Sequence, residues 1–354
     1  MKFICGNSEE TDHVDLRAAF ATGESQAASH SMRALLAIDS SQRDALWLRR
    51  MLQFAVELEF DTIPPYLFAM WSIEDLSSPA SFFISQIVRQ EMLHMGIACN
   101  LLNAIGGLPN IISSHIISPY PKQLPGGVHP GLTLDLLPVS KSVITDVFME
   151  IEKPECGPIT FFRGQTYPTI GSFYSAIREG FEALTPSDIT GERQITLHRP
   201  GMTLEPITTI DEAVAVIDLV AEQGEGTASS PLYGPSPDDK AHYYLFGEIY
   251  HEKILAQDAQ GSWSYSGQEV PFPTAIYPVA PIPTTGYTES EAFNQKFSEM
   301  LRELNSAWET GDGEGSSHLL KSFELMTELS PLGIGLMQQA APNGGNLAPT
   351  FRYL

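Results

Sequence analysis

Apolar residues recur at helical spacing over most of the chain, and this pattern predicts a mainly helical protein. The first long helix is expected over residues 42–74, after a capping signal at Asp39. Its apolar stripe consists of Leu52, Val56, Ile63 and Tyr66. Pro64 and Pro65 lie inside this pattern and predict a kink or a break, because each proline removes a backbone hydrogen bond.

The second helix is expected over residues 81–105, opened by Pro79 and closed by Gly106 and Gly107. Residues 108–138 are rich in Pro, Gly and β-branched residues, which predicts loops with short strands, the best of them at 131–137. Further helices are expected at 140–151, 170–184, 210–223, 238–257, 289–309 and 317–339. The predicted architecture is therefore an all-α bundle with an irregular β-containing insertion and extra C-terminal helices.

The pattern also predicts how the chain is divided into domains. Residues 1–40 are rich in Ser, Ala and Glu and show little periodicity, so we expect a loosely attached N-terminal arm. Residues 41–354 are expected to form a single domain. Within it the bundle helices span about 42–74, 81–105, 170–184, 210–223 and 238–257, the insertion spans 108–170, and the C-terminal helices lie within 289–339.

The charge balance narrows the function. The 354 residues include 43 Asp and Glu against 20 Lys and Arg, for a formal net charge of −23. Binding to nucleic acid or to an anionic membrane needs clustered basic residues, so neither partner is expected. No apolar run is long enough to span a bilayer, and the first residues become polar too early for a signal peptide. The three cysteines form no CxxC pair, which favours a cytoplasmic protein whose metal ligands would be carboxylates and imidazoles.

The most informative motif is Glu91-Met-Leu-His94 in the second helix. A carboxylate and an imidazole three residues apart share one helix face, so both can bind one metal inside a bundle. The helix is apolar nearly all round, and a buried carboxylate is costly unless a cation or a donor compensates it. A buried ion pair that closes a helix contact is the alternative interpretation.

A partner carboxylate is expected from the preceding helix, where two candidates lie close together. Glu59 falls on the apolar stripe of that helix, whereas Glu57 shares its face with the polar residues Gln53 and Asp61. The helical spacing therefore favours Glu59 over Glu57.

The second half of the chain offers a matching set of donors. Glu222 and Glu225 lie at the end of one predicted helix, and Asp239 and His242 lie at the start of the next. All four are candidate metal ligands. The alternative interpretation of the two glutamates is that they only form the polar end of a helix. For His242, the alternative is a structural hydrogen bond to a loop carbonyl.

Two acid-x-x-His pairs compete in this region, Asp239/His242 and Glu248/His251. Antiparallel helices bring together residues that are equally distant from their shared turn. Glu222 is close to that turn, and so is His242, whereas His251 lies about three turns farther along. This geometry favours His242, and His251 remains an alternative because its motif is better formed.

Two half-sites of one carboxylate plus an acid-x-x-His pair are the ligand set of ferritin-like di-iron and di-manganese proteins. Oxygen and imidazole donors suit Fe²⁺ or Mn²⁺, and the lack of thiolate pairs disfavours structural zinc. The expected fold is thus a ferritin-like bundle, and the expected cofactor is dinuclear iron, with manganese as the alternative. Open positions on such a centre could receive dioxygen or substrate.

Several strings of the sequence resemble the iminophenyl-pyruvate dimer synthase family, the ferritin-like domain of violacein and indolocarbazole biosynthesis. They are Leu58–Leu67, Glu91–Met95, Leu101–Gly107, Ile151–Glu155, Glu222–Thr227, His242–Phe246 and Ala348–Tyr353. The resemblance extends from about residue 45 to the C-terminus. It implies a metal-dependent catalytic site formed by Glu59, Glu91, His94, Glu222 and His242.

The resemblance also implies a reaction. An enzyme of secondary metabolism would oxidise or couple an imine derived from an amino acid, with that small molecule as its main partner. A homodimer and a partner enzyme in the same pathway are compatible with this interpretation. The alternatives are a di-iron oxidase or oxygenase that acts on another small molecule, and a non-catalytic metal-binding or scaffold bundle.

Overall fold

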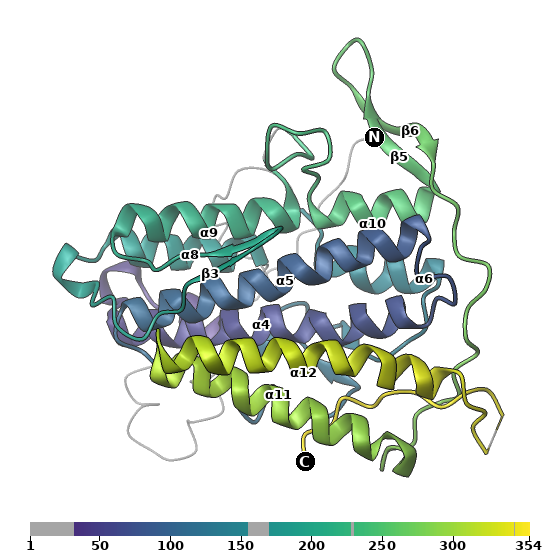
Figure 1. Cartoon of the computed structure of the whole chain (residues 1–354). Coiled ribbons are helices and arrows are strands. Elements are labelled where there is room, and N and C mark those ends of the chain that lie inside the picture. The colour runs from purple at the N-terminus through teal and green to yellow at the C-terminus, as the bar shows by residue number, and fades with distance from the viewer. Residues whose placement is uncertain (1–31, 155–169, 228–229, 343) are drawn as a thin grey trace, which may run out of the picture.

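The computed structural model of the chain describes residues 32–154, 170–227, 230–342 and 344–354. Its long helices lie in three layers (Figure 1). The middle layer is the antiparallel pair α4 (Ala45–Trp71) and α5 (Pro79–Ala104). On one side of it lies the hairpin α11 (Glu291–Thr310) and α12 (Glu314–Met337), and on the other side lie the remaining bundle helices. The apolar side chains of all three layers form one contiguous core.

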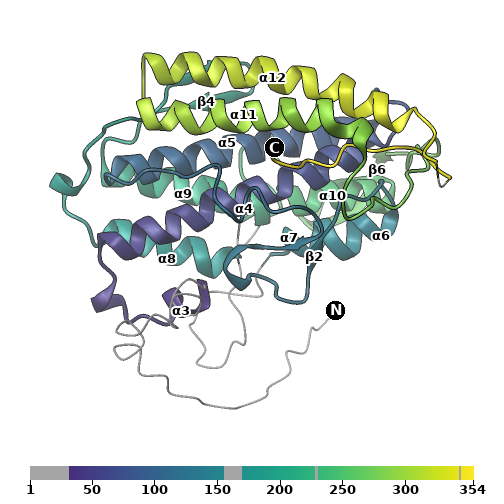
Figure 2. The ribbon, with the colours of Figure 1, turned by 90° about the horizontal axis from the view of Figure 1, so that it is seen from below.

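The third and fourth helices of the bundle are each broken in two. The third consists of α6 (Lys141–Val143), a π-helical segment (Ile144–Phe148), α7 (Met149–Ile151) and then α8 (Ile170–Glu182). The fourth consists of α9 (Ile210–Glu225) and α10 (His242–His251). Figures 1 and 2 both show α9 and α10 following one another in the same direction, with α8 beside α9 and α6 near α10, and Figure 2 shows α7 near α10 as well. The helix ends at these breaks meet in the interior of the bundle.

Helix α4 continues through Pro64 and Pro65, so the predicted break is wrong. Pro65 has no N–H to donate to the carbonyl of Asp61, four residues earlier. The hydroxyl of Tyr120 donates to that carbonyl instead, at 3.0 Å. The backbone oxygen that Pro65 leaves without a helical donor is therefore satisfied from outside the helix.

Helix α5 begins and ends where its sequence predicts. The Ser78 side chain accepts from the N–H of Ser81, and Pro79 occupies the first helical position. At the other end the N–H groups of Gly106 and Gly107 bond back to carbonyls of the last turn. Gly106 has φ 69°, a conformation that favours glycine.

The insertion after α5 covers a polar face of α4. Its short strands β1 (Lys122–Gln123) and β2 (Thr133–Leu134) are antiparallel. Asp61 on this face is fully buried, and its two carboxylate oxygens lie 2.6 Å from Lys122 Nζ and 2.6 Å from His115 Nε2. An ion-pair network therefore fixes the insertion to the helix.

Several other elements differ from the sequence-based expectation. The helix expected over 238–257 ends at His251 and continues as a strand, and residues 141–151, assigned to the insertion, belong to the third bundle helix. Of the predicted arm, residues 1–31 lie outside the described residues, but α3 (Met32–Leu36) is packed, with Met32 fully buried. The remaining elements are the hairpins β3–β4 (Leu197–Arg199, Met202–Leu204) and β5–β6 (Lys253–Gln257, Trp263–Glu269), and the 3₁₀ turns η2 (Ser40–Gln42), η3 (Pro125–Gly127), η5 (Pro186–Asp188) and η6 (Thr288–Ser290).

The mainly helical fold class is confirmed. None of the helices in the described ranges combines the length and the apolar character that crossing a bilayer requires.

Candidate metal centre

A pocket of about 400 Å³ lies where the third and fourth helices break. Its walls come from α4, α5 and the helix ends at the two breaks. Five side chains with metal-ligand chemistry face one another here, and each residue is at most 6% exposed. They are Glu59, Glu91, His94, Glu152 and His242.

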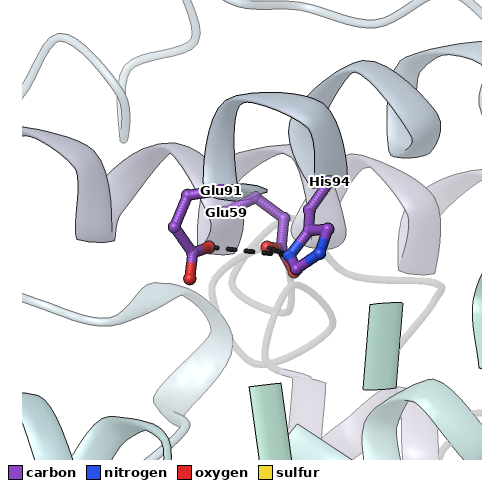
Figure 3. Close-up of side chains that lie close together, drawn as sticks. All are labelled: Glu59, Glu91 and His94. Atoms are coloured by element: carbon purple, nitrogen blue, oxygen red, sulfur yellow. Dashed lines mark ion pairs between the residues drawn. The ribbon is translucent and has the colours of Figure 1, made fainter. Parts of the chain in front are cut away.

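The first group consists of Glu59, Glu91 and His94 (Figure 3). Glu91 and His94 are one turn apart on α5, and Glu59 reaches them from the neighbouring helix α4. His94 Nδ1 lies 3.3 Å from Glu59 Oε2 and 3.9 Å from Glu91 Oε2. One cation could contact all three side chains.

The second group consists of Glu91, Glu152 and His242. His242 Nδ1 lies 2.9 Å from Glu91 Oε1 and 3.6 Å from Glu152 Oε2. In both groups the ligand atoms lie within 4.8 Å of one another. Glu91 belongs to both, with one oxygen toward each histidine, and this is the position of a bridging carboxylate.

A glutamine side chain holds the outer nitrogen of each histidine. His94 Nε2 lies 2.6 Å from Gln223 Oε1, and His242 Nε2 lies 3.1 Å from Gln90 Oε1. Gln90 is held in turn, because its amide donates to the Tyr233 hydroxyl at 2.9 Å. An amide oxygen can only accept, so each Nε2 carries the proton. In the neutral form of each histidine, which is the form that binds a metal, Nδ1 therefore presents a lone pair toward the carboxylates.

This arrangement fits a divalent metal. His242 Nδ1 is buried and has no hydrogen-bond partner among the described residues. A lone pair that faces a carboxylate oxygen at 2.9 Å is repulsive unless a proton or a metal ion lies between them. Carboxylates and neutral imidazoles are the donor set of iron and manganese centres, and outer hydrogen bonds like those of the glutamines orient their histidines.

The pKa values show how strongly the carboxylates interact. Burial, and then the charges of Glu152 and Glu59, raise the pKa of Glu91 well above its usual value. Burial acts in the same direction on Glu59, but the hydrogen bond and charge of His94 hold the pKa of Glu59 below its usual value. Without a cation, Glu91 is therefore the carboxylate that takes up a proton.

Two tyrosines complete the pocket. The Tyr66 hydroxyl donates to Glu152 Oε1 at 2.7 Å, and the Tyr174 hydroxyl donates to Glu59 Oε1. Burial, and then the adjacent carboxylates, raise the pKa of both tyrosines well above the usual value. Both hydroxyls therefore stay protonated and fix the outer oxygens of the two terminal glutamates.

Comparison with known proteins shows the family of the chain. A family profile described as ferritin-like matches residues 52–251, a range that contains all five side chains. The chain belongs to the ferritin-like family. A solved ferritin-like protein from Caulobacter vibrioides has the same fold, with a TM-score of 0.61, 22% identity, and coverage of 87% of this chain and 97% of that one. None of the curated proteins compared with the chain matches it.

Of the ligands predicted from the sequence, this ferritin-like protein brings four together: Glu59, Glu91, His94 and His242. Glu222 joins neither group among the described residues, and Gln223, one position later, reaches His94 instead. The preference for His242 over His251 assumed that α9 and α10 are antiparallel neighbours, whereas they follow one another in the same direction, so the preferred histidine was reached on a wrong premise.

The other ligand predicted in this region, Asp239, also lies outside both groups. It precedes α10, and its carboxylate accepts from the N–H of Ser236 at 2.9 Å. It therefore caps a loop and does not share a helix face with His242. The side chain of Glu225 lies outside what the structure describes.

The alternatives left open by the sequence have other partners. Glu57 accepts from the Ser113 hydroxyl at 2.7 Å under the insertion. Glu248 pairs with Lys240 at 2.8 Å. His251 is exposed and stacks on Tyr265 with ring centroids 4.2 Å apart.

Glu152 is the candidate ligand that the sequence analysis missed. It is the C-cap residue of α7, one position beyond the end of the predicted helix. The string Ile151–Glu155, which carries part of the family resemblance, contained the signal. No helical acid-x-x-His pair marks it, because its partner His242 comes from another helix.

Metal binding to this ferritin-like site is expected to strengthen as pH rises. A cation must displace the proton that the raised pKa of Glu91 favours. In the metal-free protein that raised pKa stabilises the fold at low pH, and the contribution is lost as pH rises above the usual value of 4.5 and through the raised pKa. The increase in Tm caused by Mn²⁺ should therefore be larger at about pH 7.5 than at about pH 5.5. Equal increases at both pH values would contradict the assignment.

Proposed function

We propose that the chain is a metal-dependent enzyme with a dinuclear, iron-loaded centre. The observation that carries this proposal is the position of Glu91, shared by two buried groups that each end in a histidine Nδ1. A structural ion pair would need only one such group. In a structural ion pair, each buried imidazole nitrogen would also have a hydrogen-bond partner. Here, His242 Nδ1 has none among the described residues.

Each described residue of the site has a distinct task. Glu59, Glu91, His94, Glu152 and His242 would hold the metals, and Gln90 and Gln223 keep the two histidines in the tautomer that can bind them. Bound iron would supply redox chemistry with dioxygen. The two tyrosine hydroxyls hold the terminal glutamates in place, and the apolar walls keep bulk water away.

The pocket favours a small, partly apolar substrate. Its lining combines the ligands with Leu58, Ile151, Ile170 and Val220, and contains no Lys or Arg among the described residues. We propose an imine derived from an amino acid as the substrate, on the strength of the resemblance to iminophenyl-pyruvate dimer synthases. The reaction would be oxidation, with the electrons passed to dioxygen, or coupling of two imines.

Metal analysis and oxygen uptake test the proposal. Protein expressed with iron should contain about two metal ions per chain, because five ligands with one shared carboxylate match a dinuclear centre. Glu152→Gln should reduce this to about one, whereas Glu57→Gln, a buried glutamate outside both groups, should leave it unchanged.

Oxygen uptake that depends on both iron and an aromatic amino-acid imine would identify oxidation, and imine consumption without uptake would identify coupling. The proposal fails if the protein holds well below one metal per chain and chelator leaves its Tm unchanged.

A further inference from the structure

A second, larger cavity lies on the opposite face of α4 and α5, between them and the α11–α12 hairpin. Its open space, the solvent at its mouth included, is about 750 Å³, and every side chain that lines it is apolar. Five methionines contribute to it, Met92, Met95, Met202, Met300 and Met326. Methionine is flexible and polarisable, so a wall rich in it can adapt to ligands of varying shape.

The cavity is separate from the metal centre although the same two helices line both. On α4, Phe60 and Ile63 face the cavity, whereas Glu59 and Thr62 face the metal pocket. On α5, Leu93 lines the cavity while its neighbour His94 lines the metal pocket. The two helices therefore form a wall between the sites, and the cavity is not part of the proposed substrate pocket.

One positively charged side chain, that of Arg199, lies at the edge of this cavity. Half-buried lining residues, among them Met202 on β4 and Phe323 on α12, mark where the cavity approaches the surface. The exposed Arg199, opposite Met202 in the β3–β4 hairpin, places its guanidinium 4.9 Å from the centre of the Phe323 ring. In the part of the chain that the structure describes, no carboxylate pairs with Arg199, although the protein carries a net charge of −23.

We propose that this cavity binds one long-chain fatty acid. Protein interiors are closely packed, so an apolar cavity of this size is more stable when it is filled by an apolar chain. The acyl chain would lie among the methionines, and its carboxylate would meet Arg199 at the edge. The ligand class follows from both features, because a neutral lipid would not use the arginine and a small anion would not fill the apolar space.

Native mass spectrometry with hexadecanoic acid tests the stoichiometry, and we expect one molecule per chain. Met326→Trp fills the cavity from α12 and should abolish binding. Arg199→Gln should weaken binding roughly three- to tenfold, because it removes a charged hydrogen-bond partner of the carboxylate. Arg302→Gln is the matched control: its guanidinium also lies over a ring, that of Tyr353, but neither residue lines the cavity, so affinity should not change.

A second measurement detects binding in the wild-type protein itself. Trp308 lines the cavity and is 3% exposed. Hexadecanoic acid with a bromine on its terminal carbon should quench tryptophan fluorescence in the wild type, and Trp308→Phe should remove most of that quenching. Hexadecanol, which has the same chain without the carboxylate, should compete more weakly than the acid. The proposal is overturned if the acid does not bind one to one, if bound acid does not quench Trp308, or if folded Met326→Trp binds as the wild type does.

Discussion

Glu91→Gln is expected to abolish tight metal binding while leaving the metal-free protein at least as stable as the wild type. Glu91 contributes to both ligand groups, so its loss should weaken metal binding by more than the ~10–100-fold that follows removal of an outer-shell partner. In the metal-free protein, however, Glu91 faces Glu59 and Glu152, whose charges raise its pKa. A neutral amide removes both the repulsion that the ionised carboxylate would feel and the need to protonate it. Metal titration and thermal unfolding, each with and without chelator, measure the two effects.

Glu248→Gln provides the matched control, because Glu248 is equally buried but pairs with a cation of the protein itself. Its carboxylate lies 2.8 Å from Lys240. Removing it leaves a buried ammonium without a counter-charge, which should cost about 3–5 kcal/mol and leave the metal content unchanged. If metal-free Glu91→Gln were destabilised as strongly as this control, Glu91 would be a structural ion-pair partner, and the metal centre would be refuted.

Asp61→Asn is expected to lower the free energy of unfolding by about 3–5 kcal/mol, because it removes the counter-charge of a buried lysine. Asp61 is fully buried, Lys122 is 8% exposed, and the two charged groups lie 2.6 Å apart. The loss should be visible in urea unfolding as a lower midpoint.

A double substitution separates the charge effect from simple packing. Asp61→Asn combined with Lys122→Met removes both partners, and such replacements of a buried pair are often close to neutral. We therefore expect the double variant to recover much of the stability that Asp61→Asn loses. If the double variant were as unstable as the single one, the ion pair would not be the source of the loss.

The first half of the site could be predicted from the sequence because its geometry is local. Glu91 and His94 share a face of one helix, and the apolar stripe of the preceding helix carries Glu59. Two antiparallel helices joined by a short turn leave little freedom in how these side chains meet. Helical periodicity was therefore sufficient to place Glu59 and not Glu57 beside them.

The second half could not be placed in the same way, because it depends on where helices break. His242 is the first residue of α10, and Glu152 lies at the end of α7, so neither position follows from a helical repeat. The rule that antiparallel neighbours meet at equal heights, which was used to choose His242 over His251, does not apply here because α9 and α10 run in the same direction. Contacts between segments distant in sequence were equally hidden, such as the hydrogen bond from the Tyr120 hydroxyl to the Asp61 carbonyl that Pro65 leaves without a helical donor.

The breaks in the third and fourth helices have a consequence for how this scaffold could change its substrate. Ile151, Ile170, Gly224 and His242 all line the metal pocket, and they lie at or next to the helix ends on the two sides of each break. Insertions or deletions between those ends would alter the shape of the pocket wall without shifting Glu59, Glu91 or His94 on the intact helices. Related sequences should therefore differ in length most at these two connections, while the intact pair α4 and α5 keeps a constant length.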